Sequence, residues 1–206
     1  MILWGAEGVG EWAAFPEYSD SDSAHWLASA LEQMWSLSIS EADVSLAPIS
    51  VNGIFPALPL EKIPGWWQKF PGAKSAKMKV AESAGCLQID LKRAQAVRRT
   101  IGEQTALRLD ANGRWSVDEA EEALARLSDF SLDYVEQPVE TVGEMVELKK
   151  RLDGSGIRLA ADELIRGTHT LEDIISADAA DVAVLKASPL GGIQPTLKLA
   201  RQAAAA

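Results

Sequence analysis

Short apolar runs that end in a charged residue recur through the second half of the chain. They cover residues 106–110, 132–136, 157–162 and 182–186, and they end in Asp110, Glu136, Asp162 and Lys186. After each run come a polar turn and apolar residues at three- and four-residue steps, which predicts a strand followed by a helix. The charged ends lie 26, 26 and 24 residues apart. This period fits parallel strands joined by crossover helices, so we expect the charged ends to gather at one end of one sheet.

Two further strands are predicted ahead of this repeat, at residues 49–55 and 76–80. A helix is expected over residues 58–70 between them, despite Pro64, and another over residues 91–101. The chain therefore offers six strands, whereas a closed (β/α)8 barrel has eight. A six-stranded open sheet is the alternative. We interpret the chain from residue 48 to residue 206 as an incomplete TIM-type (β/α)8 barrel domain of the α/β class.

Residues 1–47 have a different pattern. Residues 1–4 read as a strand, residues 5–18 as a loop, and a helix with one apolar stripe begins near Asp22. This pattern predicts part of a small α+β domain that precedes the barrel. Because its first strand has no partner strand before it, we expect this domain to be incomplete.

The starts of three helices carry their own signals. Residues 116–119 and residues 141–144 both fit the capping box, in which a hydroxyl and a glutamate satisfy free backbone amides. The caps are therefore supplied downstream of the acidic strand ends. Gly191 and Gly192 precede the last helix, where backbone amides could bind an anion or the pair could simply make a turn.

The three acidic strand ends are candidate metal ligands. If Asp110, Glu136 and Asp162 meet at one end of a sheet, their carboxylates repel one another and require a cation. All-oxygen ligation suits a hard divalent ion, Mg²⁺ first, with Mn²⁺ as a possible substitute. The alternative is that each acid only caps the helix that follows it.

Lys77 and Lys79 stand two positions apart in a predicted strand and therefore project from the same face. Met78 and Val80 are apolar and suit the face of the strand that packs against the helices. The lysines are therefore expected to face the barrel interior. Two neighbouring ammonium groups depress at least one pKa, and a lysine then becomes a usable base. The alternative is an exposed pair of lysines on an edge strand.

Composition limits the possible partners. The chain has 206 residues, a net charge of −10 and a pI near 4.7, which argues against nucleic-acid or membrane-surface partners. An anionic substrate would need a local metal and a few lysines. The single cysteine, Cys86, excludes an internal disulfide. There is no apolar run of about 18 residues and no basic region followed by an apolar one at the N-terminus, so we expect a cytoplasmic protein.

Five motifs on successive predicted strands resemble those of the enolase superfamily in order and spacing. They are Lys77–Lys79, Asp110–Asn112, Glu136–Pro138, Asp162–Glu163 and Leu185–Gly192. Within the superfamily the likeness is to the muconate-lactonizing-enzyme subgroup, and there to the o-succinylbenzoate synthase family of menaquinone biosynthesis. Residues 8–12 and 16–18 resemble the capping-domain loop of that family. The resemblance implies only part of a capping domain at residues 1–47 and an incomplete barrel domain after it. The chain would be truncated at both ends, lacking the first strands of the cap and barrel units seven and eight.

The resemblance also implies roles for individual residues. Asp110, Glu136 and Asp162 would hold Mg²⁺, and Lys79 would remove the proton α to the carboxylate of a small anionic substrate. Lys186 would stabilise the resulting anion from the opposite wall. Supporting roles would fall to three more residues, with Lys77 tuning Lys79, and Asn112 and Glu163 orienting ligands.

The reaction implied is that of a hydro-lyase, a carbon–oxygen lyase. It is the dehydration of 2-succinyl-6-hydroxy-2,4-cyclohexadiene-1-carboxylate to o-succinylbenzoate. Alternatives within the superfamily are a racemase or epimerase of N-acylamino acids or dipeptides, and a cycloisomerase. A further alternative is a catalytically inert fragment, because the missing barrel units would leave strand edges uncovered.

Overall fold

The computed structural model describes residues 1–35, 49–83, 85–165 and 168–206. The chain divides into two compact units. The first unit comprises Met1–Ala47, Ile165–Ser176 and Ala183–Ala206, and the second comprises Pro48–Leu164 and Ala177–Val182. The predicted domain boundary between residues 47 and 48 lies outside the described residues. Each unit is considered by itself below.

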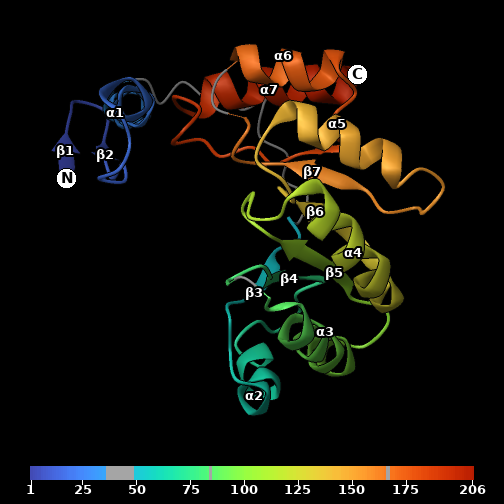
Figure 1. Cartoon of the computed structure of the whole chain (residues 1–206). Helices are drawn as coiled ribbons and strands as arrows, with labels where there is room; N and C mark the ends of the chain where they lie inside the picture. The colour runs from blue at the N-terminus through green and yellow to red at the C-terminus, as the bar shows by residue number, and fades with distance from the viewer. Residues whose placement is uncertain (36–48, 84, 166–167) are drawn as a thin grey trace. The chain divides into compact units, whose positions relative to one another are not determined.

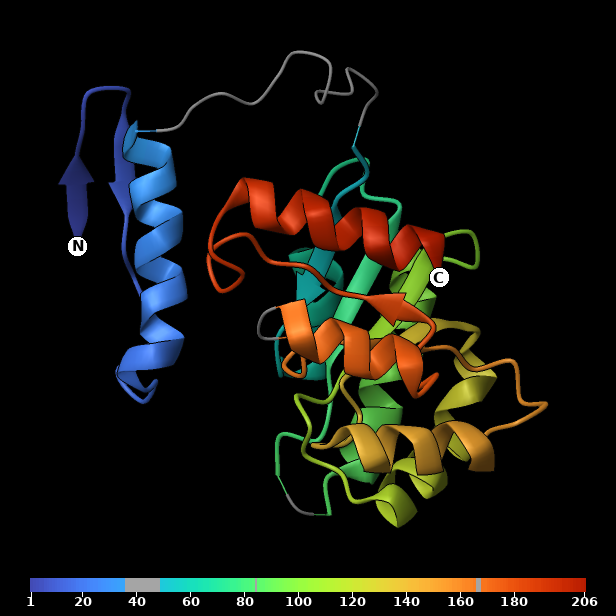
Figure 2. The same ribbon diagram turned by 90° about the horizontal axis from the view of Figure 1, so that it is seen from above.

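A sheet of parallel strands forms the centre of the second unit (Figures 1 and 2). Its strands, in both chain order and sheet order, are β3 (Asn52–Phe55), β4 (Ser75–Lys79), β5 (Ala106–Asp110), β6 (Leu132–Glu136), β7 (Leu159–Ala161) and β8 (Val182–Ala183). The register sets Lys79 beside Asp110, and Asp110 beside Glu136. Two of the charged residues that the sequence places at strand ends, Asp110 and Glu136, are therefore neighbours across the sheet.

Helices follow the strands of this unit and cover one face of the sheet (Figure 1). They are α2 (Ile63–Trp67), α3 (Leu87–Ile101), α4 (Val117–Leu127) and α5 (Val142–Arg151), with short 3-10 helices η2 (Leu60–Lys62) and η3 (Ser128–Phe130). Leu107 and Leu109 of β5 and Leu124 of α4 are completely buried in this layer. Because side chains alternate along a strand, the intervening residues of β5 project from the opposite face of the sheet. That second face carries the charged residues.

The predicted capping boxes of α4 and α5 are both present. Ser116 accepts the backbone N–H of Glu119, whose carboxylate accepts the N–H of Ser116, and Thr141 and Glu144 are paired in the same way. These contacts satisfy amides that the first turn of a helix leaves free. Asp110 and Glu136 are therefore not needed as helix caps.

Arg98 ties the end of α3 to the segment between α4 and β6. The side chain is buried, and its guanidinium donates to four backbone carbonyls, those of Gly102, Thr105, Phe130 and Ser131, at 2.7 to 3.1 Å. A single buried cation thus satisfies several backbone acceptors at once. The contacts fix the amino ends of β5 and β6 relative to α3.

The first unit contains an antiparallel hairpin of β1 (Ile2–Trp4) and β2 (Val9–Glu11). Helix α1 (Asp20–Trp35) lies along this hairpin (Figure 2). A Cβ atom at Gly10 would lie 2.1 Å from the carbonyl oxygen of Ala30, so this close approach of strand and helix requires glycine. Helices α6 (Thr168–Ser176) and α7 (Ile193–Ala205) complete the unit.

Within the first unit, α1 supplies a carboxylate to the first turn of α7. Glu32 accepts the backbone N–H groups of Ile193 and Gln194, the second at 3.0 Å. A Cβ atom at Gly192 would lie 2.3 Å from Oε2 of Glu32, so the glycine leaves room for this contact. A negative charge is favourable at a helix N-terminus. The amides that bind this carboxylate are those that follow the glycine pair, because Gly191 and Gly192 themselves donate to the carbonyls of Ser188 and Ala187.

Three predicted elements differ from the structure. The predicted loop at residues 5–18 contains strand β2, and the predicted helix at residues 58–70 is reduced to η2 and α2. Pro64 stands in the first turn of α2, where a missing N–H costs nothing. The last predicted strand ends at Ala183, so Lys186 does not end a strand but lies three residues beyond it. No helix among the described residues is both long and apolar enough to cross a membrane.

Candidate active site

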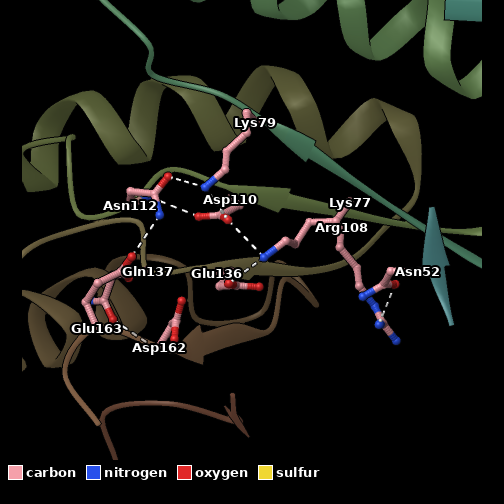
Figure 3. Close-up of polar contacts among 10 residues, drawn as sticks. All are labelled: Asn52, Lys77, Lys79, Arg108, Asp110, Asn112, Glu136, Gln137, Asp162 and Glu163. Atoms are coloured by element: carbon pink, nitrogen blue, oxygen red, sulfur yellow. Dashed lines mark hydrogen bonds and ion pairs between the residues drawn. The ribbon is translucent and has the colours of Figure 1, made fainter. Parts of the chain in front are cut away.

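Charged and polar side chains gather at the carboxyl ends of β4 to β7 (Figure 3). We call this group the strand-end cluster; its members are Lys77, Lys79, Asp110, Asn112, Glu136, Asp162 and Glu163. The three carboxylates predicted as metal ligands are all buried: Asp110 and Glu136 are each 1% exposed and Asp162 is 6% exposed. Buried charges of one sign require compensation by cations or hydrogen bonds.

The two lysines of β4 supply much of this compensation. Nζ of Lys77 lies 2.9 Å from Oδ2 of Asp110 and 2.7 Å from Oε1 of Glu136. Nζ of Lys79 lies 2.8 Å from the same Oδ2 of Asp110. The two lysines therefore project from one face of β4 toward the carboxylates, as their spacing predicted. They are not an exposed pair on an edge strand.

The contacts of Lys77 change its acidity. Burial disfavours its ammonium group, but hydrogen bonds to Glu136 and Asp110 outweigh burial and raise the pKa of Lys77. Lys77 is therefore not a lysine whose pKa its neighbour depresses. The carboxylates, whose positions depend on strand register, dominate its surroundings. Lys77 stays charged at neutral pH.

The pKa values of Asp110 and Glu136 shift in opposite directions. Burial opposes ionisation of Asp110, yet hydrogen bonds from Lys79 and Lys77 outweigh it and lower the pKa of Asp110. For Glu136, burial and the like charges of Asp110 and Asp162 outweigh Lys77 and raise its pKa to about 7. The charges of all three acids thus act on one another. Such mutual repulsion is what a bound cation would relieve.

Asn112 joins several members of the strand-end cluster. Its Oδ1 accepts from Nζ of Lys79 at 2.5 Å, and its Nδ2 donates to Oε1 of Glu163 at 2.8 Å. Its backbone N–H donates to Oδ1 of Asp110 at 3.2 Å. The residue has a positive φ of 51°, which asparagine tolerates better than most residues. Asn112 therefore orients Lys79 and links it to the turn that follows β7.

The donor set fits a hard divalent cation chemically. Asp110, Glu136 and Asp162 offer only oxygen, the ligand type that Mg²⁺ prefers, and their charges already interact. As the side chains lie, no three His, Cys, Asp or Glu residues in the described part of the chain are close enough together to hold a metal ion. Lys77 instead holds Asp110 and Glu136 together. Lysine ammonium groups therefore engage Oδ2 of Asp110 and Oε1 of Glu136, two of the oxygens that a cation would need.

Lys186 is the one predicted site residue that belongs to the first unit. Its side chain is exposed, and it follows the short strand β8. All members of the strand-end cluster belong to the second unit. Seven of the eight residues singled out from the sequence therefore lie in one unit, and Lys186 belongs to the other unit.

Gln137 is a buried residue of the site that the sequence analysis did not single out. It follows Glu136 and is 1% exposed. Its Oε1 accepts the backbone N–H of Asp162 at 3.0 Å, and its Nε2 donates to the carbonyl of Val139 at 2.7 Å. The only clue in the sequence was its position between Glu136 and Pro138. An analysis based on the pattern of charged residues does not select an uncharged amide.

Comparison with known proteins supports the assignment of this architecture. The model of the family "Enolase C-terminal domain-like" matches residues 68–206, and "Enolase N-terminal domain-like" matches residues 1–34. The chain is 42% identical over 202 residues to o-succinylbenzoate synthase of Mycobacterium ulcerans (strain Agy99), covering 98% of this chain and 59% of that protein. It is 40% identical over 204 residues to the enzyme of Mycobacterium tuberculosis (strain ATCC 25177 / H37Ra), covering 98% and 60%.

Solved structures give the same picture. An N-succinyl Arg/Lys racemase from Bacillus cereus ATCC 14579 is 32% identical, with a TM-score of 0.62 over 71% of this chain and 38% of that chain. A racemase from Streptomyces coelicolor A3(2) with bound magnesium is 25% identical, with a TM-score of 0.69 over 76% and 47%. The chain spans about 60% of the length of the curated relatives it matches. Because the C-terminal family model covers more than half of the chain, and strand order and register agree with it, the chain belongs to the enolase superfamily.

Proposed function

We propose that the strand-end cluster is the active site of an o-succinylbenzoate synthase type hydro-lyase, an enzyme of menaquinone biosynthesis. The observation that carries this proposal is the contact of Lys79 with both Asp110 and Asn112, which sets an amine beside the predicted metal ligands. The identity of 42% with an o-succinylbenzoate synthase over nearly the whole chain supports the reaction. The substrate is a cyclohexadiene carboxylate, a small anion suited to a site with lysines.

Asp110, Glu136 and Asp162 would hold Mg²⁺, or Mn²⁺ in its place. When bound, the metal would supply positive charge that stabilises the substrate carboxylate as its α carbon becomes electron-rich. Glu163 contacts Asn112 rather than Lys79, so its role is to hold the asparagine side chain in place. The acids must give up part of their contact with the lysines when a divalent cation binds. The lysine amines would then be available to contact the substrate.

Lys79 is the residue proposed to move the proton. As a neutral amine, its Nζ takes the proton from the carbon α to the carboxylate, so that an N–H bond forms and a C–H bond breaks. The released electron pair expels the hydroxyl group from the neighbouring ring carbon. The ammonium of Lys79 then returns a proton to that leaving group, which departs as water. The ring becomes aromatic, and the amine is restored.

Lys77 and Lys186 have different roles in this proposal. Because its pKa is raised, Lys77 remains an ammonium and is a fixed cation rather than a base. Its side chain is 16% exposed, against 29% for Lys79, so Lys79 is the more accessible of the two. Lys186 would stabilise the anion formed after proton removal, because its positive charge is attracted to the face of an aromatic ring.

A racemase or epimerase is the second candidate. The 32% identity to an N-succinyl Arg/Lys racemase favours it, because such an enzyme also removes a proton α to a carboxylate. In that reaction Lys79 and Lys186 would act as two bases on opposite faces of the substrate. Dehydration needs only one base. The two candidates therefore differ in whether the substrate loses a hydroxyl group as water or only has a stereocentre inverted.

Proton exchange in deuterated water tests the proposal. We expect Lys79→Ala to abolish exchange of the α proton of the substrate while Mg²⁺ binding, measured by calorimetry, is retained. Asp162→Ala should lose both. Lys74→Ala, which removes an exposed lysine just before β4, is the matched control and should keep both activities. Full exchange in the Lys79 variant would remove that residue from its assigned role.

The products distinguish the candidates. Release of o-succinylbenzoate supports the hydro-lyase, and racemisation of an N-acylamino acid without dehydration would overturn it. If the 206-residue chain binds Mg²⁺ but turns over neither substrate, this result supports the alternative that the chain is a catalytically inert fragment.

A further inference from the structure

Gln137 has a backbone conformation that its surroundings must enforce. Its φ is +39°, in the left-handed region that residues other than glycine rarely adopt. It is nearly fully buried, directly after the carboxylate of Glu136 at the end of β6. Non-glycine residues in such conformations persist only where several contacts hold them.

Contacts from three successive strand ends converge on this residue. Its backbone N–H donates to the carbonyl of Ala160 in β7 at 2.8 Å, and its carbonyl accepts the N–H of Gly113, beyond β5, at 2.6 Å. Its side-chain Nε2 donates to Val139, in the turn after β6. Gln137 therefore joins the turns that follow β5, β6 and β7. These are the turns next to the three proposed metal ligands.

The side-chain oxygen of Gln137 makes the contact most relevant to the site. Oε1 accepts the backbone N–H of Asp162 at 3.0 Å (Figure 3). It also accepts the backbone N–H of Leu164 at 3.3 Å. Asp162 directly follows β7, where the sheet ladder no longer holds its amide. The Gln137 oxygen accepts the backbone N–H groups in the first turn after the strand instead. Without it, a buried N–H at Asp162 would lose its partner, which is costly.

We propose that Gln137 is a positioning residue that sets the backbone at Asp162 and thereby aligns its carboxylate with that of Glu136. This inference rests on the metal site proposed above. Gln137 is covalently joined to one ligand and hydrogen-bonded to the backbone of another, so it couples the two positions directly. Outer contacts of this kind typically change metal affinity by about 10- to 100-fold when they are removed. Gln137 itself does not touch the substrate or the metal.

Two substitutions separate its acceptor function from its bulk. Gln137→Met keeps a similar volume but cannot accept the N–H groups of Asp162 and Leu164. Gln137→Glu retains an acceptor oxygen for both amides. Ser75→Ala is the matched control, because Ser75 is also buried and hydrogen-bonded but lies at the opposite end of β4, where its hydroxyl contacts Asn52.

Two measurements are made on the 206-residue chain without substrate. Amide hydrogen exchange, read by mass spectrometry on the segment 159–165, reports the contact with Gln137. Mn²⁺ affinity, read by electron paramagnetic resonance, reports the metal site. We expect Gln137→Met to accelerate exchange in this segment and to weaken Mn²⁺ binding by at least about tenfold. Gln137→Glu should restore the exchange protection, and Ser75→Ala should match the wild type in both measurements.

The outcomes distinguish this inference from the function on which it rests. If the wild type binds no Mn²⁺, the proposed metal site fails, and exchange alone still tests the contact with Gln137. If the wild type binds Mn²⁺ and Gln137→Met binds it equally well, the positioning role is overturned. Equal loss of exchange protection in Gln137→Glu and Gln137→Met would also overturn it, because the acceptor oxygen would then not be responsible. The Glu variant keeps the test decisive if the Met variant does not fold.

Discussion

The ammonium group of Lys77 donates to the carboxylate of Glu136 at 2.7 Å, although the two residues are 59 positions apart in the chain. The same nitrogen lies 2.9 Å from Asp110, so one side chain from β4 joins the ends of β5 and β6. Two of the carboxylates proposed as metal ligands are thus paired with a cation of the protein itself. If they bind a metal as proposed, stability and metal binding depend on each other.

Replacement of Lys77 by methionine should show this dependence. The variant leaves Asp110 and Glu136 buried without their shared cation, so we expect the free energy of unfolding to fall by about 3 kcal/mol. Mg²⁺ should restore more stability to this variant than to the wild type, because it would supply the missing charge. Urea denaturation with and without Mg²⁺ measures both effects. Lys69→Met, which removes an exposed lysine over Trp66, should lose less than about 1 kcal/mol and show no added response to Mg²⁺.

Arg98 should be among the most sensitive positions for stability. Arg98→Met removes a buried guanidinium that donates to four backbone carbonyls, and we expect a loss of about 3 kcal/mol in the free energy of unfolding. The neighbouring Arg99 is exposed, so Arg99→Met should change stability by less than about 0.5 kcal/mol. Urea titrations of both variants give the comparison. Equal stabilities would show that the carbonyls find other partners.

The capping box of α4 should contribute stability that depends on pH. Hydrogen bonds from the backbone N–H and then the hydroxyl of Ser116 lower the pKa of Glu119 below its usual 4.5. A carboxyl group with a lower pKa in the folded state stabilises the fold above its unfolded pKa and loses this effect as the pH falls through the folded pKa. The stability difference between wild type and Glu119→Gln should therefore be greatest near neutral pH and vanish below pH 4.5.

Thermal denaturation at several pH values measures this difference. At neutral pH, Ser116→Ala should cost about 1 kcal/mol, as the loss of a helix cap commonly does. A difference between wild type and Glu119→Gln that grows toward acidic pH would contradict the sign of the pKa shift.

Cys86 should react slowly with alkylating reagents. Burial raises the pKa of its thiol, and the carboxylate of Asp90, which accepts from Sγ at 3.1 Å, adds to this effect, while a hydrogen bond with the backbone of Ser83 opposes it. Only the thiolate reacts, so the midpoint of the pH profile should lie above 9.0 in the folded chain. Iodoacetamide labelling of folded and urea-unfolded protein provides the test. A lower midpoint in the folded chain would contradict the prediction.

Much of the fold of the second unit could be predicted from the sequence. The bounds of β5 and β6 agree with the predicted runs, because each run is rich in apolar residues and closed by an acid. The short elements were harder to predict. Strand β2 has three residues with glycine at its centre, so it carries no alternating pattern. Its pairing with β1, rather than its own composition, makes it a strand.

The candidate site could be predicted in membership but not in its contacts. The spacing of Lys77 and Lys79 placed them on one face, because strand geometry fixes that alternation. Which carboxylate each lysine meets depends on register, and the register between β5 and β6 shifts between Leu107 and Arg108. No local pattern reveals such a shift. For this reason the raised pKa of Lys77 emerged only from the three-dimensional arrangement.

The carboxylate of Glu32 at the start of α7 has a consequence for the order of assembly. Glu32 and Ile193 are 161 positions apart. During synthesis the hairpin and α1 leave the ribosome long before the residues that Glu32 binds have been made. Closing so long a stretch of chain is entropically slow compared with forming local contacts. The unit that begins the polypeptide is consequently the one that must wait for the rest of the chain before all of its partners are in place.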